Sequence, residues 1–267
     1  MIPPGDIFKE AHRAGVSDLM IEKDYAVSWL LVAIAESYLR DCVAFKGGTA
    51  LKKVYYPEYR FSEDLDFTLL VDLSSEDLQA AVEGLFPSLA RRPKIECARL
   101  KPSEVRSEST TVWVNFVGPL GAALHRRVVK IDFTRPEPLL DELNELPLTA
   151  PYRDYPSHVH MPTYTLQEIL AEKLCALIGR NEPRDLYDIY WLLESGDIDT
   201  TFLPDAFATK AEHKGRDPAR LGQALTKKKA RLEKEWESRL GQQTVDLPPY
   251  KQVYQGVRRH IRKLELD

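Results

Sequence analysis

The sequence lacks any long apolar run, and this absence argues against a membrane-spanning segment. No stretch approaches the roughly 18 uninterrupted apolar residues that a bilayer crossing needs. The first residues include Asp6 and Glu10 and have no continuous apolar core, so we expect no secretory signal. Cysteine is also scarce, since Cys42, Cys97 and Cys175 are scattered, odd in number and without metal-site spacing. We therefore expect a cytoplasmic protein with free thiols and no membrane partner.

Internal repeats and low-complexity tracts are also missing, so the chain has the makeup of an ordinary globular protein. Of its 267 residues, 43% are apolar and 29% are charged, which is typical of soluble folds. This length can bury a sizeable core and suits one large domain or two modest ones. His158 and His160 have no third ligand near them in sequence, and we interpret them as loop histidines rather than a zinc site.

Acidic and basic residues are unevenly distributed, although the net charge is only −4. From Lys210 to Asp267 the sequence has 15 Lys/Arg and 8 Asp/Glu, a net charge of +7, so the preceding 209 residues carry −11. A basic C-terminal part can bind a polyanion, but solvated helices with lysine-rich faces have the same composition. On charge alone we favour the solvated helices.

Hydrophobic periodicity divides the chain into a mixed part and a helical part, separated by the proline-rich stretch 135–162. The expected strands are 43–46, 64–71, 94–100, 110–118 and 126–134. The expected helices are 18–40, 49–55, 75–89, 165–178, 183–195, 199–212, 218–240 and 249–264. Ser17 is the expected cap of the first helix. We predict an α+β fold, with a sheet domain and its helices over 1–160 and a helical domain over 161–267.

Two adjacent glycines, Gly47 and Gly48, follow the first expected strand and precede a helix. Paired glycines let the backbone approach a ligand closely, and free N–H groups at a helix start attract phosphate. A Gly-Gly pair between a strand and a helix is more often only a turn. This motif alone is therefore weak evidence for a phosphate site.

Two aspartates stand on the next expected strand. Period-two alternation places Asp64 and Asp66 on one face, whereas Leu65 and Phe67 enter the core. Neighbouring carboxylates repel each other and are costly to bury unpaired. A bound divalent cation explains them best, and Mg²⁺ is the oxygen-seeking candidate. The alternative is that both lie at a solvated strand entry near Glu63.

A third carboxylate, Asp132, belongs to the expected strand 126–134. The apolar residues of that strand alternate inward, which leaves Lys130 and Asp132 on the opposite face. We favour a metal role for Asp132 because the first two aspartates need a partner. The alternative is an Asp–Lys pair on a half-exposed strand.

A lysine interrupts the apolar stripe of the expected helix 165–178. Lys173 lies four residues after Ile169 and four before Leu177, on the face that should be buried. It either snorkels at a domain seam or reaches a negative ligand. On the following helix, Asp185 and Asp188 are one turn apart and share a face, although an aspartate at a helix start is commonly a cap.

Several short motifs, in matching order along the chain, resemble the AbiEii/AbiGii toxin family of bacterial toxin–antitoxin and phage-defence systems. The matching blocks are EKDY (22–25), KGGTAL (46–51), FSEDLDF (61–67), AEKLCAL (171–177) and PRDLYD (183–188). A Gly-Gly turn followed by Asp-x-Asp on a strand is also similar to the core motif of the polymerase-β-type nucleotidyltransferase superfamily. The interval from Gly48 to Asp64 is slightly longer than is usual there. Residues 199–267 carry no such motif.

The resemblance implies a nucleotidyltransferase toxin with a polymerase-β-type sheet. It implies a functional serine at Ser62 and active-site roles for Lys173 and a downstream aspartate, with Asp185 favoured over Asp188. The residues expected to hold the nucleoside triphosphate (NTP) are Lys46, Gly47, Gly48, Thr49 and Ser62. The residues expected to bind Mg²⁺ or Mn²⁺ are Asp64, Asp66 and Asp132. Asp132 is also expected to accept the proton of the attacking hydroxyl.

Toxins of this family are thought to modify RNA, with tRNA acceptor ends as the leading substrate, and to be paired with an antitoxin. The basic residues of 210–263 suit RNA, because phosphate contacts need Lys and Arg. Two alternatives remain: a small-molecule adenylyltransferase of the antibiotic-modifying kind, and an inactive module that binds a partner protein. Retention of the Gly-Gly and Asp-x-Asp motifs argues against an inactive site.

Overall fold

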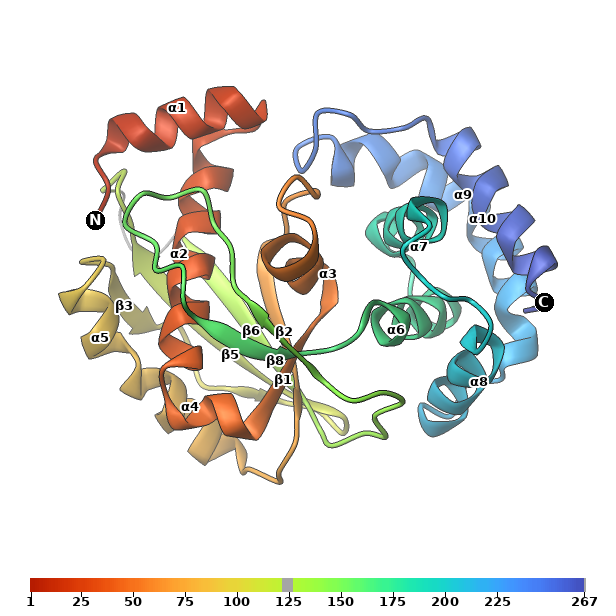
Figure 1. The fold of residues 1–267 in the computed structure, drawn as a ribbon, viewed down its shortest axis with the longest axis horizontal. Helices are drawn as coiled ribbons and strands as arrows, with labels where there is room; N and C mark the ends of the chain where they lie inside the picture. The colour runs from red at the N-terminus through yellow and green to blue at the C-terminus, as the bar shows by residue number, and fades with distance from the viewer. Residues whose placement is uncertain (122–126, 267) are drawn as a thin grey trace. The chain divides into compact units, whose positions relative to one another are not determined.

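The computed structural model describes residues 1–121 and 127–266, and Figure 1 traces its elements. The chain divides into two compact units. Unit 1 comprises Met1–Glu137 and Leu143–Tyr164, and unit 2 comprises Pro138–Glu142 and the chain from Thr165 onward. None of the helices in the described residues combines the length and the hydropathy that a bilayer crossing requires.

Unit 1 is built on a mixed sheet. Its described strands are β1 (Val43–Lys46), β2 (Asp64–Leu69), β3 (Glu96–Arg99), β4 (Glu104–Val105), β5 (Ser109–Val117), β6 (Val128–Thr134), β7 (Asn144–Pro147) and β8 (His160–Thr163). They follow the order β3-β5-β6-β2-β1-β8-β7, with β4 paired to β5. The pairs β2–β6 and β1–β8 are parallel, whereas β1–β2 and β5–β6 are antiparallel. The mixed sheet with its helices confirms the predicted α+β class.

The apolar face of this sheet carries the core of unit 1. Phe45 on β1, Phe67 on β2 and Phe133 on β6 are fully buried. The ring centroids of Phe45 and Phe67 lie 5.3 Å apart, and those of Phe67 and Phe133 lie 5.6 Å apart. Such pairs across neighbouring strands stabilise a sheet and fix its register. Because side chains alternate, this register sets which residues share the opposite face.

Helix α2 (Asp18–Ala35) is buried along most of its length, and Figure 1 shows it beside the sheet. Ser17 caps it as predicted, since its hydroxyl accepts a hydrogen bond from the Met20 N–H at 3.2 Å. The helix ends earlier than predicted because Ser37 caps a separate 3₁₀ turn. The other helical elements of unit 1 are α1 (Pro4–Ala14), η1 (Tyr38–Cys42), α3 (Gly47–Ala50), the π-helical η2 (Leu51–Tyr55), α4 (Ser75–Gly84) and α5 (Phe86–Arg91).

Unit 1 departs from the predicted elements in other places as well, and the short strand β4 is one of them. The predicted helix 75–89 is two helices, and the second starts with Pro87 in its first turn, where proline is tolerated. Helix α1 was not predicted. The proline-rich stretch 135–162 was expected to be irregular, but it forms β7 and leads into β8, which pairs with β1. Arg126, the first residue of the predicted strand 126–134, lies outside the described residues.

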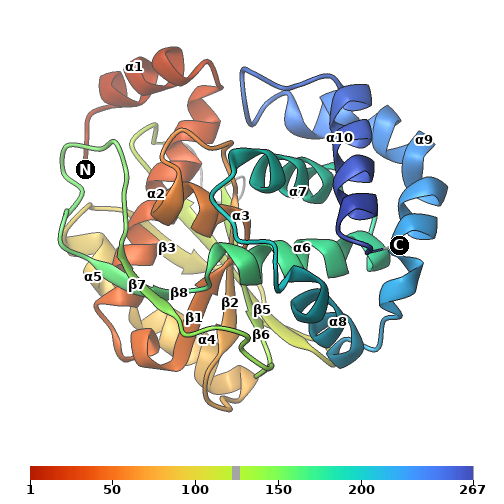
Figure 2. The ribbon, with the colours of Figure 1, turned by 45° about the vertical axis from the view of Figure 1, so that its right-hand side comes forward.

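Unit 2 is helical, as predicted, and Figure 2 displays its helices. They are α6 (Leu166–Gly179), α7 (Pro183–Ser195), α8 (Leu203–His213), the 3₁₀ turn η4 (Pro218–Arg220), α9 (Leu221–Leu240) and α10 (Tyr250–Lys263). Helix α6 contacts α7, α8 and α9, and α10 packs against both α7 and α9. The predicted apolar stripe of α9 is buried at Leu221, Leu225, Leu232, Trp236 and Leu240.

Candidate active site

One face of the unit 1 sheet carries three of the predicted aspartates. In the parallel pairing of β2 with β6, Asp66 stands opposite Asp132 and Asp64 stands opposite Lys130. Leu65, between the two aspartates of β2, is fully buried, whereas all three aspartates are half-buried. The predicted alternation is therefore confirmed, and the three carboxylates leave the sheet on the same face.

Asp132 is held by two neighbours on that face. Thr111 on β5 is its register partner and donates a hydrogen bond to Oδ1 at 2.6 Å. The Lys130 ammonium lies 3.4 Å from Oδ2, so the Asp–Lys pair considered from the sequence does form. The Asp132 side chain nevertheless keeps 24% of its surface exposed. Its carboxylate is thus oriented by protein contacts and still accessible.

The two glycines are packed closely against polar side chains of the candidate site. Gly47 has φ = +80°, in the left-handed region that favours glycine. A Cβ atom on Gly47 would lie 2.6 Å from Oδ2 of Asp66. A Cβ atom on Gly48 would lie 2.8 Å from Nη2 of Arg60 and 3.3 Å from Oγ of Ser62. The backbone of the turn therefore lies directly against Asp66 on one side and against Arg60 and Ser62 on the other.

Thr49 connects this turn to the aspartate strand. It is fully buried, and its hydroxyl donates a hydrogen bond to the main-chain carbonyl of Asp64. The bond fastens α3 to the start of β2. The geometry gives Thr49 a positioning contact, and its predicted contact with a triphosphate stays a prediction.

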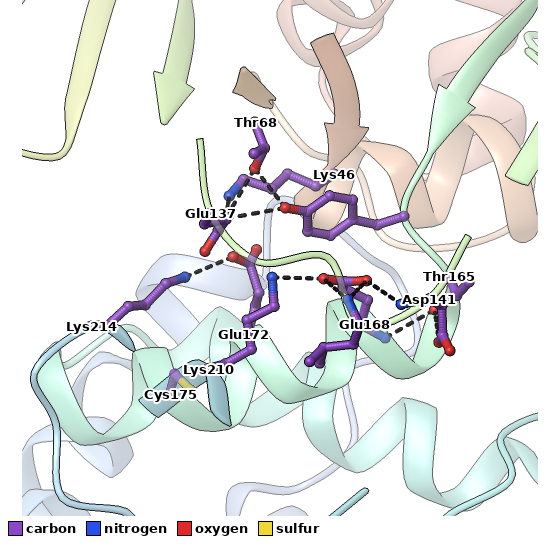
Figure 3. A network of polar contacts seen from close by, with 12 residues as sticks. Lys46, Thr68, Glu137, Asp141, Thr165, Glu168, Glu172, Cys175, Lys210 and Lys214 are labelled. Carbon is purple, nitrogen blue, oxygen red and sulfur yellow. Dashed lines mark hydrogen bonds and ion pairs between the residues drawn. The ribbon is translucent and has the colours of Figure 1, made fainter. Parts of the chain in front are cut away.

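Lys46 belongs to a buried cluster that the sequence did not reveal. Its ammonium lies 2.8 Å from Oε1 of Glu137, and the two side chains are 7% and 1% exposed. The hydroxyls of Thr68 and Tyr164 donate to the same oxygen at 3.0 and 3.1 Å. Figure 3 shows Lys46 and Thr68 directed toward Glu137. Lys46 is the register partner of Asp66, so the cluster adjoins the aspartates on the same face.

The donors on this face suit a hard divalent cation in their chemistry. Asp64, Asp66 and Asp132 offer carboxylate oxygens, which Mg²⁺ prefers, and Gly47 places no side chain against Asp66. Within residues 1–121 and 127–266, however, no three Asp, Glu, His or Cys side chains converge closely enough to hold a metal ion. The set therefore fits Mg²⁺ or Mn²⁺ by donor type and shared face, and its role as a metal site stays a prediction.

Unit 2 brings together the residues predicted within it. The Lys173 ammonium on α6 lies 3.0 Å from Oδ1 of Asp185 and 2.8 Å from Oδ2 of Asp188, both on α7. Arg180, which the sequence did not single out, donates two hydrogen bonds to Asp185 at 2.7 and 2.9 Å. Both aspartates are fully buried. The lysine on the apolar stripe therefore has two carboxylate partners inside its own unit.

The pKa of Asp185 reflects the charges that surround its carboxyl group. Burial raises the pKa of its carboxyl group, but the positive charges of Lys173 and Arg180 outweigh burial, so the pKa lies below its ordinary value of 3.8. Asp185 is therefore ionised at neutral pH. Both aspartates contact Lys173, so these contacts do not indicate which of the two has the predicted active-site role.

The EKDY block on α2 has mainly structural contacts. Glu22 is fully buried and forms an ion pair with Arg127. Asp24 accepts hydrogen bonds from the Lys53 ammonium and the Tyr152 hydroxyl, each at 2.7 Å. These contacts fasten α2 to η2, to the residue that precedes β6 and to the chain between β7 and β8. The block thus stabilises the framework that carries the polar face.

Solved structures with a similar fold span nearly the whole chain. The nucleotidyltransferase toxin MenT4 (Rv2826c) from Mycobacterium tuberculosis H37Rv has a TM-score of 0.65 and 20% identity, with 99% of this chain and 97% of that chain covered. JHP933 from Helicobacter pylori has a TM-score of 0.55 and 17% identity, with 94% and 95% covered. No functionally curated protein sequence shows a significant match.

The chain shares its fold with MenT4, and one face of its mixed sheet carries paired aspartates beside a Gly-Gly turn. The model of the AbiEii nucleotidyl transferase toxin family, a type IV toxin–antitoxin family, matches residues 29–258. This match spans most of the chain, and the chain therefore belongs to the AbiEii family. The resemblance noted from its motifs is confirmed.

Proposed function

We propose that this chain is a metal-dependent toxin that transfers a nucleotide from an NTP to tRNA, within a bacterial toxin–antitoxin or abortive-infection system. Membership of the AbiEii family supports the toxin and transferase parts of the proposal. The metal is inferred from the aspartates, and the RNA acceptor from the basic C-terminal helices. The protein would then act in the cytoplasm, where an antitoxin controls it.

The observation that carries this proposal is the register of β2 against β6. It sets Asp66 beside Asp132 on one face, and the Gly47 backbone lies directly against Asp66. Two adjacent, partly exposed carboxylates repel each other unless a cation or a proton lies between them. A glycine turn at the start of a helix offers backbone N–H groups, which bind phosphate.

In the proposed reaction, a hydroxyl oxygen of the RNA bonds to the α-phosphorus of the NTP. The bond from that phosphorus to the oxygen bridging to the β-phosphorus breaks, and pyrophosphate leaves with the bonding electrons. Asp132, oriented by Thr111, accepts the proton of the attacking hydroxyl. Asp64 and Asp66, with Asp132, would hold Mg²⁺, which supplies charge neutralisation on the phosphates. The N–H groups of Gly47 and Gly48 and the Ser62 hydroxyl hold the triphosphate.

Glu137 and Lys46 act in this proposal as a positioning pair. Glu137 is 1% exposed and accepts from three donors, so its carboxylate is fixed. It holds the Lys46 ammonium on the face that also carries Asp66. A positive charge on that face offsets part of the negative charge of the carboxylates and of the triphosphate. Both side chains are buried. Lys46 was among the residues predicted to hold the NTP, whereas Glu137 was not predicted.

Lys173, Asp185 and Asp188 have two compatible roles. Family resemblance assigns Lys173 and one of the aspartates to the active site. Their mutual ion pairs support a further role, in which they join α6 to α7. A stability measurement separates the second role from the first, because a purely catalytic lysine contributes little to folding.

The test incubates the purified protein with total tRNA, Mg²⁺ and each α-³²P-labelled NTP in turn. We expect the wild type to label tRNA from one preferred NTP, and EDTA to abolish labelling. Asp66→Asn should reduce the rate by at least about 100-fold. Asp72→Asn is the matched control, since Asp72 follows the same strand but its side chain is 83% exposed. It should label tRNA at the wild-type rate.

Other outcomes lead to the alternatives. Mg²⁺-dependent NTP binding without tRNA labelling would contradict the tRNA acceptor and favour a small-molecule adenylyltransferase. No Mg²⁺-dependent NTP binding at all would favour an inactive module that binds a partner protein. Labelling by Asp66→Asn at the wild-type rate would remove the aspartate face from the mechanism.

A further inference from the structure

The cations of the C-terminal helices fall into two groups, and the first group points into unit 2. Lys210 is fully buried and lies 2.6 Å from Oε1 of Glu168, an ion pair drawn in Figure 3. The Lys228 ammonium donates to the carbonyls of Leu177 and Ile178, at the C-terminal end of α6, at 2.5 and 2.8 Å. A cation there satisfies unpaired carbonyls and the negative end of the helix dipole. These two lysines stabilise the fold. The prediction that the basic residues of 210–263 bind RNA therefore applies only to the remaining cations.

The second group belongs to two segments that contain no acidic residue, although Arg220, Arg231 and Arg259 pair with acids outside these segments. Lys228, of the first group, also belongs to one of them. Residues 218–232, which form η4 and the first part of α9, contain five Lys/Arg and no Asp or Glu. Helix α10 also contains five Lys/Arg and no Asp or Glu. On ordinary solvated helices opposite charges mix, because like charges one turn apart repel each other and destabilise the helix. The cations of these segments that have no acidic partner gain free energy from an anionic ligand.

The two segments border one groove on the surface of unit 2, with a volume of about 660 Å³. Its lining residues are Ala219, Gly222, Gln223, Thr226, Lys227 and Arg258. Arg258 on α10 donates to the Thr226 hydroxyl on α9 at 3.3 Å, so its guanidinium spans the two helices at the groove. Within the part of the chain that the structure describes, neither Lys227 nor Arg258 has a carboxylate partner. The groove therefore presents hydrogen-bond donors and positive charge without a neutralising acid.

We infer that this groove binds the sugar-phosphate backbone of the RNA acceptor, with Lys227 and Arg258 as the phosphate contacts. The inference rests on the proposed function and adds to it a surface of unit 2 that binds the acceptor RNA. Protein–protein interfaces have an apolar centre, but the lining of this groove includes no large apolar side chain. Backbone contacts to RNA need cations and donors and no reading of bases, which is what the groove supplies.

The test measures binding of fluorescein-labelled total tRNA to the full chain across a salt series. The groove variant is Lys227→Gln/Arg258→Gln. The matched control is Lys234→Gln/Arg239→Gln, which removes the same charge from exposed positions of α9 that do not line the groove. We expect the groove variant to bind tRNA at least about tenfold more weakly, and its log–log salt slope to be smaller by about 1 to 2. The control should change both quantities much less, and all proteins should keep the same thermal midpoint and the same Mg²⁺–NTP affinity.

Three results would contradict the inference that this groove binds RNA. The first is wild-type affinity and salt slope in the groove variant. The second is equal losses in the groove variant and the control, which would mean that the effect is total charge. The third is retained tRNA binding with loss of binding to poly-glutamate, which would assign the groove to an acidic protein. Failure of the proposed function is distinguishable, because it would appear as absence of α-label transfer by the wild type whatever the groove binds.

Discussion

Gly47 is a residue at which the candidate site leaves no space for a side chain. Its φ is +80°, and a Cβ atom there would lie 2.6 Å from Oδ2 of Asp66. Gly47→Ala should therefore strain the backbone and displace the carboxylate. We expect the free energy of unfolding to fall by about 1–3 kcal/mol and the rate of nucleotide transfer to fall at least about tenfold. Urea denaturation and the labelling assay measure the two effects.

Gly196 provides the control for this prediction. It has φ = +76°, and nothing lies within 4 Å of the position its Cβ would take. Gly196→Ala should thus share the backbone strain and leave nucleotide transfer unchanged. Full activity in Gly47→Ala would contradict the importance of the close approach to Asp66.

The aspartate face could be predicted from sequence because its signal is local. Apolar Leu65 and Phe67 alternate with Asp64 and Asp66, and a strand has only two faces. Glu137 could not be found in this way. It meets Lys46 from 91 residues away, out of a proline-rich stretch without periodicity. Arg180 was missed for a similar reason, because its importance follows from the fold of α6 against α7.

At the scale of elements, the joint between α6 and α7 depends on the buried Lys173. Lys173→Met would leave Asp185 and Asp188 buried without that cation. Removing one partner of a buried ion pair is expensive, so we expect the free energy of unfolding at pH 7 to fall by about 3–5 kcal/mol. Lys251→Met, at an exposed position of α10, is the control and should change it by less than about 0.5 kcal/mol.

The dependence of this loss on pH follows from Asp185. Its pKa is lowered in the folded chain from 3.8, so its stabilisation is present above that value and is lost as pH falls through the lower, folded pKa. The stability difference between wild type and Lys173→Met should therefore be constant near neutral pH and shrink below about pH 4. A small difference in unfolding free energy between the two proteins at pH 7 would contradict the proposal that Lys173 joins α6 to α7. Normal stability with lost activity in Lys173→Arg would support a catalytic role beside it.

Most elements could be predicted because their hydrophobic periods are long and regular, as in α9. The strands β7 and β8 could not. Each has four residues, both contain proline, and their pairing partners are set by tertiary contacts. Helix α2 ends at Ala35, earlier than predicted, because Ser37 starts a separate 3₁₀ turn within an otherwise helical sequence pattern.

For the whole molecule, hydrophobic periodicity predicted a mixed part followed by a helical part, and the chain divides into two units. The short segment Pro138–Glu142 belongs to unit 2 although it precedes strands of unit 1. Its membership depends on the Leu140 and Asp141 N–H groups, which donate to Glu168. No hydrophobic period or motif in the sequence predicts that this short segment belongs to the second unit. The charge asymmetry was visible from sequence, but which cations are buried was not.

If the chain adds nucleotides to RNA, the intact mass of the acceptor RNA must increase by whole nucleotide residues. One purified tRNA is incubated with the protein, Mg²⁺ and the preferred NTP, then weighed by mass spectrometry. We expect the RNA to gain one or more whole nucleoside monophosphate residues, with one pyrophosphate released for each residue added, and to gain nothing with Asp66→Asn. An unchanged RNA mass, or a gain of phosphate alone, would contradict nucleotide transfer to RNA.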